Sequence, residues 1–155
     1  MTNHMKDFLS EGRKLRQELR KNGFFLIIEE SQDTAIFLKS IVKGKEAKCR
    51  NAKTVDAALG IIEAEGTDIR CAVIDLLVPD TKNRGGIRVI EYLESHCSGI
   101  PYVVHSNDRK QSEQIILKYP RASVLLKGAQ FGEIIAMLGL NNENEPEDRR
   151  KSPRS

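Results

Sequence analysis

Residues 71–79 read Cys-Ala-Val-Ile-Asp-Leu-Leu-Val-Pro, an apolar run that contains one acid, Asp75. Strands that are buried on both faces of a parallel sheet have continuous apolar runs of this kind, whereas a strand with one solvated face alternates. The segment Cys71–Val78 therefore predicts a buried strand, with Asp75 near its C-terminal end.

Other strands are predicted on both sides of this segment. Three more apolar runs are typical of buried strands, and a weaker one, Ala47–Asn51, alternates with Lys48 and Arg50 as an edge strand does. The three runs are Phe24–Ile28, Ile100–Val104 and Ser123–Leu126.

Between and after these runs, apolar residues recur at helical spacing, for example Val55, Leu59 and Ile62. Repeated alternation of strand and helix predicts parallel strands with right-handed crossovers and helices on both faces. Five strands and about five helices give an α/β fold, a doubly wound parallel sheet, over residues 23–140.

Polar residues lie near the C-terminal ends of four of the apolar runs or directly after them. Open α/β sheets bind ligands beyond the carboxyl ends of their strands, so these residues are expected to meet at one rim. Carboxylates held together without compensation raise one another's pKa or require a cation, and Mg²⁺ suits a site of oxygen ligands that also handles phosphate. The residues are Glu29 and Glu30, Asp75, His105, Ser106 and Asn107, and Lys127.

These residues and their order resemble the signature of response-regulator receiver domains. The matching segments are LIIEES, VIDLLVP, VVHSN and VLLKG, within a stretch from Phe24 to about Leu140. Pro79 and the pair Gly85-Gly86 also fall where the family has a proline and a helix-opening glycine, although the loop Asp80–Arg84 is longer than usual. The resemblance implies a flavodoxin-like sheet of strand order 2-1-3-4-5.

The resemblance also implies a role for each residue at the rim. Asp75 would accept a phosphoryl group, and Glu29, Glu30, Asp75 and the backbone carbonyl of Leu77 would hold Mg²⁺. Ser106 and Lys127 would then contact phosphoryl oxygens, because phosphoryl transfer depends on alignment and charge neutralisation. The implied function is a stand-alone receiver that signals through protein contacts and is not a turnover enzyme.

The chain departs from the family's pattern at the end of each of three strands and within the last one. Glu29-Glu30 replaces an acidic pair that contains Asp, Asn107 replaces a small residue, and Val124 stands where the family has a switch aromatic. Gly128 replaces the proline after the lysine, and a cis bond before a non-proline residue costs about 2.5–4 kcal/mol. A trans Lys127–Gly128 bond is therefore expected, with the Lys127 ammonium displaced from the acids.

Each of these residues also has a simpler interpretation. The two glutamates could be solvated charge and Lys127 a surface lysine. Ser106 could serve as the N-cap of a helix that begins near Asp108, and His105 is more typical of a packed residue than of a ligand.

Composition limits the remaining possibilities. The net charge of +3 is too small to indicate nucleic-acid binding by itself. No segment approaches the ~20 apolar residues of a membrane span, and three cysteines without CxxC spacing indicate reduced thiols in a cytoplasmic protein: Cys49, Cys71 and Cys97.

Two terminal segments differ from the domain between them. Residues 1–22 are basic and place Phe8, Leu15 and Leu19 at helix-compatible spacing. This extension is interpreted as a helix that packs on the domain, a homodimer or partner-docking helix, or, less favoured, a nucleic-acid contact. Residues 141–155 have no large apolar side chain and are predicted to be disordered.

Three functions remain as hypotheses. The first is the phosphorylated receiver, with a sensor histidine kinase or phosphotransfer protein as donor and a downstream protein as target. The second is a pseudo-receiver, a binding module that no longer cycles phosphate. A metal-dependent phosphohydrolase is the third, but the sequence has no DxDxT, GxGxxG or P-loop motif.

Overall fold

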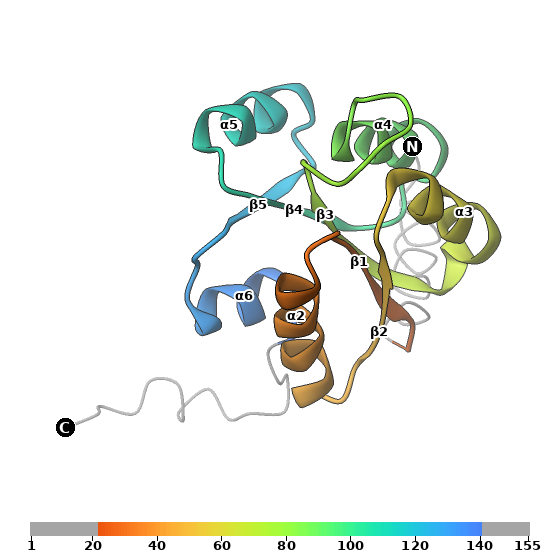
Figure 1. Cartoon of the computed structure of the whole chain (residues 1–155). Helices are drawn as coiled ribbons and strands as arrows, with labels where there is room; N and C mark the ends of the chain where they lie inside the picture. The colour runs from red at the N-terminus through yellow and green to blue at the C-terminus, as the bar shows by residue number, and fades with distance from the viewer. Residues whose placement is uncertain (1–21, 141–155) are drawn as a thin grey trace, which may run out of the picture.

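The structure is a computed structural model, and it describes residues 22–140. Strands and helices alternate along this part of the chain, with one 3₁₀ turn, η1, before the central strand (Figure 1). The elements are β1 (Phe24–Ile28), α2 (Gln32–Gly44), β2 (Lys48–Ala52), α3 (Val55–Glu65), η1 (Gly66–Asp68), β3 (Ile69–Asp75), α4 (Gly86–His96), β4 (Tyr102–Ser106), α5 (Arg109–Lys118), β5 (Ser123–Leu126) and α6 (Phe131–Met137).

All five strands form one parallel sheet in the order β2-β1-β3-β4-β5. This confirms the predicted doubly wound fold and its flavodoxin-like strand order. The bounds predicted for β1 and β5 agree with the structure. The bounds predicted for β3 and β4 do not: β3 ends at Asp75, and β4 begins at Tyr102 and extends to Ser106.

Helices cover both faces of the sheet and divide the core into two layers (Figure 1). Side chains of α3, α4 and α5 pack against one face, around Leu26 and Ile74. Side chains of α2 and α6 pack against the other face, around Ile27 and Val73. Because neighbouring residues of a strand point to opposite layers, both faces need apolar residues, and the strands are continuous apolar runs for this reason.

Two adjacent glycines hold the start of α4 against the end of β3. Gly85 has φ +67° and precedes the helix, and Gly86 is its first residue. A Cβ on Gly86 would lie 2.5 Å from the Asp75 carbonyl oxygen, a separation that real Cβ atoms do not adopt. The glycine pair is therefore required for α4 to approach the strand that carries Asp75.

The long loop after β3 is held to α4 by an ion pair of Arg88, and the same arginine also pairs with α3. Arg88 of α4 contacts Asp80 of the loop at 2.7 Å and Asp56 of α3 at 3.1 Å. Asp80 also accepts the backbone N–H groups of Lys82 and Arg84. Ordering the extra residues of this loop costs conformational entropy, and these bonds offset part of that cost.

No helix within residues 22–140 is long and apolar enough to cross a membrane. The predicted helical extension and the predicted disordered tail lie outside the described residues, apart from Asn22. The domain boundaries therefore stay predictions.

Candidate functional site

The C-terminal ends of β1, β3, β4 and β5 bring four of the predicted polar residues to one rim. Asp75 is the last residue of the central strand, and Ser106 is the last residue of β4. Glu29 follows β1 directly, and Lys127 follows β5 directly. Parallel topology thus gathers residues that are almost one hundred positions apart in the sequence.

Asp75, Glu29 and Lys127 form a compact charged group. The Lys127 ammonium nitrogen lies 3.4 Å from Asp75 Oδ1 and 3.6 Å from Glu29 Oε1. Both acids are almost fully buried, whereas the lysine side chain is partly exposed. Leu77 completes the contacts of Asp75 by donating its backbone N–H to Oδ1 at 3.1 Å.

The surroundings of Glu29 disfavour the ionised form of its carboxyl group. Burial raises the pKa of Glu29, and the nearby Asp75 carboxylate raises that pKa further. The Ser31 N–H and the Lys127 ammonium act in the opposite direction without cancelling the effect. Glu29 Oε1 is buried and accepts no hydrogen bond within residues 22–140, so one carboxylate oxygen is available for a further positive group.

The expected displacement of Lys127 is wrong. The Lys127–Gly128 bond is trans, as predicted, yet the ammonium lies between the two acids. The backbone N–H of Lys127 donates to the Ser106 carbonyl at 2.8 Å, which extends the contact between β4 and β5 past the end of β5. Gly128 then turns the chain with φ +91°, so no proline is needed to place the lysine.

Ser106 is buried, and its hydroxyl oxygen accepts a hydrogen bond from the turn that follows β4. Ser106 Oγ accepts the backbone N–H of Asp108 at 3.0 Å. The alternative reading of Ser106 as the N-cap of α5 is wrong, because Asp108 is the cap and accepts the N–H of Gln111. The hydroxyl proton of Ser106 has no acceptor within the described residues, so it is free to donate.

His105, which the sequence placed at the rim as a packed residue, is buried beside the charged group. It is in register with Asp75 on the neighbouring strand and is only 6% exposed. Burial lowers the pKa of His105 and the Lys127 charge lowers it further, although Asp75 opposes them. Its Nδ1 is buried and has no hydrogen-bond partner in the described part of the chain.

Glu30 is separated from the other acids. It is exposed, and no hydrogen bond or ion pair connects it to Asp75. Within residues 22–140 no three His, Cys, Asp or Glu side chains are arranged as a metal cluster. Of the residues predicted to hold Mg²⁺, Glu29 and Asp75 both contact Lys127, Leu77 contacts Asp75 through its backbone N–H, and Glu30 is exposed; their roles as ligands stay predictions.

Mg²⁺ nevertheless suits the two buried carboxylates. This ion is usually held by one or two carboxylates together with waters and phosphate oxygens, so it does not require three acidic side chains. Two adjacent acids, one with a raised pKa and an oxygen without a hydrogen bond, form a donor set that a hard divalent cation would neutralise.

Several solved structures are similar to this chain, whereas no protein-family model and no curated protein matches it. A response regulator receiver domain protein from Clostridium thermocellum has a TM-score of 0.66 at 12% identity, over 76% of this chain and 91% of that chain. A CheY-like receiver domain protein from Methanospirillum hungatei has a TM-score of 0.66 at 15% identity, over 76% and 90%. The BeF3-activated N-terminal receiver domain of RstA from Klebsiella pneumoniae has a TM-score of 0.66 at 16% identity, over 76% and 97%.

Proposed function

We propose that this chain, which has the fold of a response-regulator receiver domain, accepts a phosphoryl group on Asp75 and signals through protein contacts. The observation that supports this most strongly is the Lys127 ammonium 3.4 Å from Asp75 Oδ1, at the end of the central strand. A lysine there offsets charge on the acceptor and on an incoming phosphoryl group, which is what phosphoryl transfer requires of a protein.

The proposed step forms one bond and breaks one bond. An Asp75 carboxylate oxygen attacks the phosphorus atom of a phosphohistidine or a small phosphodonor, and the bond from phosphorus to the donor's nitrogen or oxygen breaks. Lys127 and the free hydroxyl proton of Ser106 would contact phosphoryl oxygens. Mg²⁺ held by Glu29 and Asp75 would supply further charge neutralisation when bound.

The added charge would change the surface near Ser106. A phosphoryl group carries about −1.5 to −2 charges at pH 7. A new hydrogen bond donated by Ser106 would pull its hydroxyl toward the phosphoryl group, and the bond that Oγ accepts from the Asp108 N–H would pass this shift to the start of α5. A downstream protein could recognise that shift, and a sensor histidine kinase or phosphotransfer protein is the proposed donor, in the cytoplasm. In this proposal the chain is a phosphoacceptor that can lose its phosphoryl group by self-hydrolysis, and it is not a turnover enzyme.

Labelling by a small phosphodonor tests the proposal. Acetyl phosphate with Mg²⁺ should add one phosphoryl group to the intact chain, measured by mass spectrometry. Asp75→Asn should abolish the mass gain while the far-ultraviolet circular dichroism stays unchanged. Asp80→Asn is the matched control, because Asp80 lies in the adjacent loop and bonds Arg88 instead of Lys127. Persistent labelling of Asp75→Asn would move the phosphorylation site elsewhere.

A pseudo-receiver is the second candidate, and the exposed Glu30 favours it. Without Glu30 the acidic group has two carboxylates, and Lys127 already contacts both. Such a group could hold the rim in one conformation without phosphate. The absence of labelling in the wild-type chain with both Mg²⁺ and acetyl phosphate would select this function.

A further inference from the structure

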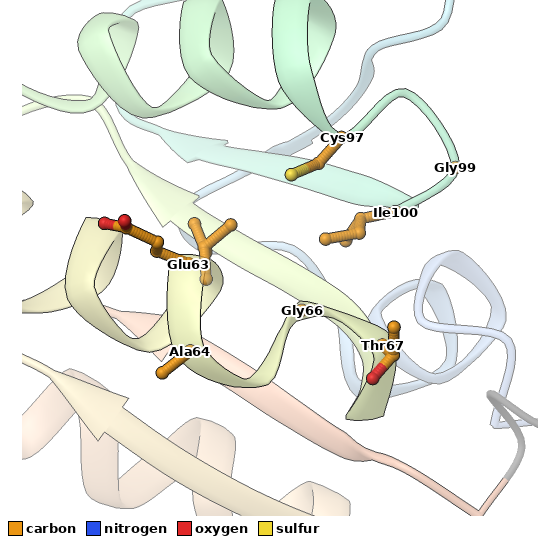
Figure 2. Close-up of a pocket in the computed structure, with 8 residues that line it drawn as sticks. Glu63, Ala64, Gly66, Thr67, Cys97, Gly99 and Ile100 are labelled. Atoms are coloured by element: carbon orange, nitrogen blue, oxygen red, sulfur yellow. The ribbon is translucent and has the colours of Figure 1, made fainter.

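A cavity lies at the end of the sheet opposite to the acidic rim. It has a volume of about 310 Å³ and lies between the C-terminal ends of α3 and α4 (Figure 2). Ile62 and Ile100 form an apolar floor, with Cys97 and Gly66 beside them. The cavity is open to solvent on one side, and its volume is about twice that of the ~150 Å³ cavity that holds a benzene-sized ligand, so it has room for about two aliphatic side chains.

The chain enters the domain beside this cavity. Gly23 precedes β1, and a Cβ built on it would lie 2.2 Å from the backbone oxygen of Asp68. Asp68 directly follows Thr67, which lines the cavity. The segment before Gly23 therefore starts within a residue or two of the cavity wall.

That segment, residues 1–21, is complementary to the cavity in polarity and charge. Leu15 and Leu19 are four residues apart, so they lie on one side of a helix. The segment has six Lys or Arg residues against three Asp or Glu. The exposed acids next to the cavity are Glu63 and Asp68, and neither forms an ion pair with another described residue.

We propose that residues 1–21 fold back on their own domain and place Leu15 and Leu19 in this cavity. Four residue steps separate Leu19 from Gly23, and they span at most ~14 Å when extended, which keeps Leu19 close to the cavity. A covalent connection this short gives an effective concentration in the millimolar range, which favours the chain's own segment over a second copy or a partner. The contact is independent of Asp75 and of phosphorylation.

The reactivity of Cys97 reports on this contact in the full-length chain. Cys97 lines the cavity and is half-buried within the described residues, so a docked segment should shield it from N-ethylmaleimide. The double variant Leu15→Asp/Leu19→Asp should release the segment and raise the alkylation rate of Cys97 about tenfold, the change that 1.4 kcal/mol produces. Mass spectrometry of the Cys97 peptide measures the rate.

Three internal controls separate docking from other effects. Gln17→Asp adds a charge on the opposite side of the predicted helix and should leave the rate unchanged. Cys49 is half-buried on β2 and should alkylate equally in all variants. Burial raises the pKa of the Cys71 thiol to about 12, so Cys71 stays unreactive as long as the domain is folded.

Each other outcome would overturn the proposal. If Cys97 alkylates equally fast in the wild-type chain and in the double variant, the segment does not cover the cavity. If the protection of Cys97 disappears on dilution, the segment of a second copy covers it instead, as in the predicted homodimer. Acetyl phosphate labelling of the same samples is scored separately, because its failure would concern Asp75 alone.

Discussion

Glu29 and Glu30 are adjacent in sequence, but the structure gives them different surroundings. Glu29 is 2% exposed and lies next to Lys127, whereas Glu30 is exposed. The sequence could not decide which of the two turns inward, because β1 is buried on both faces and has no alternation to read. Only the structure showed that Glu29 is the acid that shares Lys127 with Asp75.

Magnesium binding should distinguish the two glutamates. A ligand that binds only the folded state stabilises it by about 2.7 kcal/mol at one hundred times its Kd. We expect Mg²⁺ to raise the Tm of the wild-type chain, and Glu29→Gln to remove most of that increase. Thermal unfolding with and without Mg²⁺ measures the effect. Glu30→Gln is the control and should retain most of the increase; equal losses would give both glutamates the same role.

His105 should make the folded protein sensitive to acid. Its pKa is lowered in the folded state, mainly by burial, so below pH 6.5 the unfolded chain binds a proton that the folded chain does not. The unfolding free energy should therefore fall as the pH drops below 6.5, by up to about 1.36 kcal/mol per pH unit. Denaturant titrations from pH 7 downward measure it.

Glu29 also makes the stability depend on pH: its pKa is raised, so the unfolding free energy falls as the pH rises above about 4.5. Variants separate the contribution of His105 from that of Glu29. His105→Gln should flatten the acid side of the stability curve relative to wild type. The exposed His96 provides the control, and His105→Gln should change the acid side of the curve more than His96→Gln does. A wild-type curve that matches that of His105→Gln would show that His105 binds protons equally in both states.

At the scale of elements, the start of α4 is fixed by close backbone packing. The nearest neighbour of an added Cβ at Gly86 would be the carbonyl oxygen of Asp75 itself. We expect Gly86→Ala to cost roughly 1–3 kcal/mol of unfolding free energy, as overpacking does, and to slow the labelling of Asp75. Urea denaturation and the acetyl phosphate assay measure the two effects.

Gly60 is the matched control within another helix. A Cβ there would meet no atom within 4 Å, so Gly60→Ala in α3 should stabilise the protein by about 0.5–1 kcal/mol. Labelling of Asp75 should be unaffected. If both alanines had the same effect on stability, the contact between α4 and β3 would not be the cause.

The errors in strand bounds have identifiable physical causes. β3 ends at Asp75 because the Val78 N–H donates to the Asp75 carbonyl in a turn, yet Leu76 and Val78 are buried in the loop and extend the apolar run. β4 continues through His105 and Ser106, whose polarity hides them from an apolar pattern. Hydrophobicity reports burial, and burial does not coincide with strand pairing at these ends.

At the scale of the whole molecule, the pattern of apolar runs predicted a doubly wound parallel sheet, and the resemblance to receiver domains supplied its strand order. The similar receiver domains share only 12% to 16% of their residues with this chain, but each superposes with a TM-score of 0.66. The position of Lys127 was not predictable in the same way. It follows from the backbone hydrogen bond of Lys127 to Ser106 and from the turn at Gly128, and a pattern of apolar side chains specifies neither.

Arg70 lies at the start of the central strand and touches both ends of the domain. A Cβ on Gly23 would lie 3.1 Å from its backbone nitrogen, and its guanidinium donates to the Gly139 carbonyl. The two ends of the domain are therefore about one arginine side chain apart, at the side opposite to Asp75. A circular permutant could join them with a short glycine-rich linker and place new termini elsewhere, for example between Lys82 and Asn83. The domain could then be spliced into a host protein as a cassette, and the proposed phosphorylation at the rim would control the separation of the new ends.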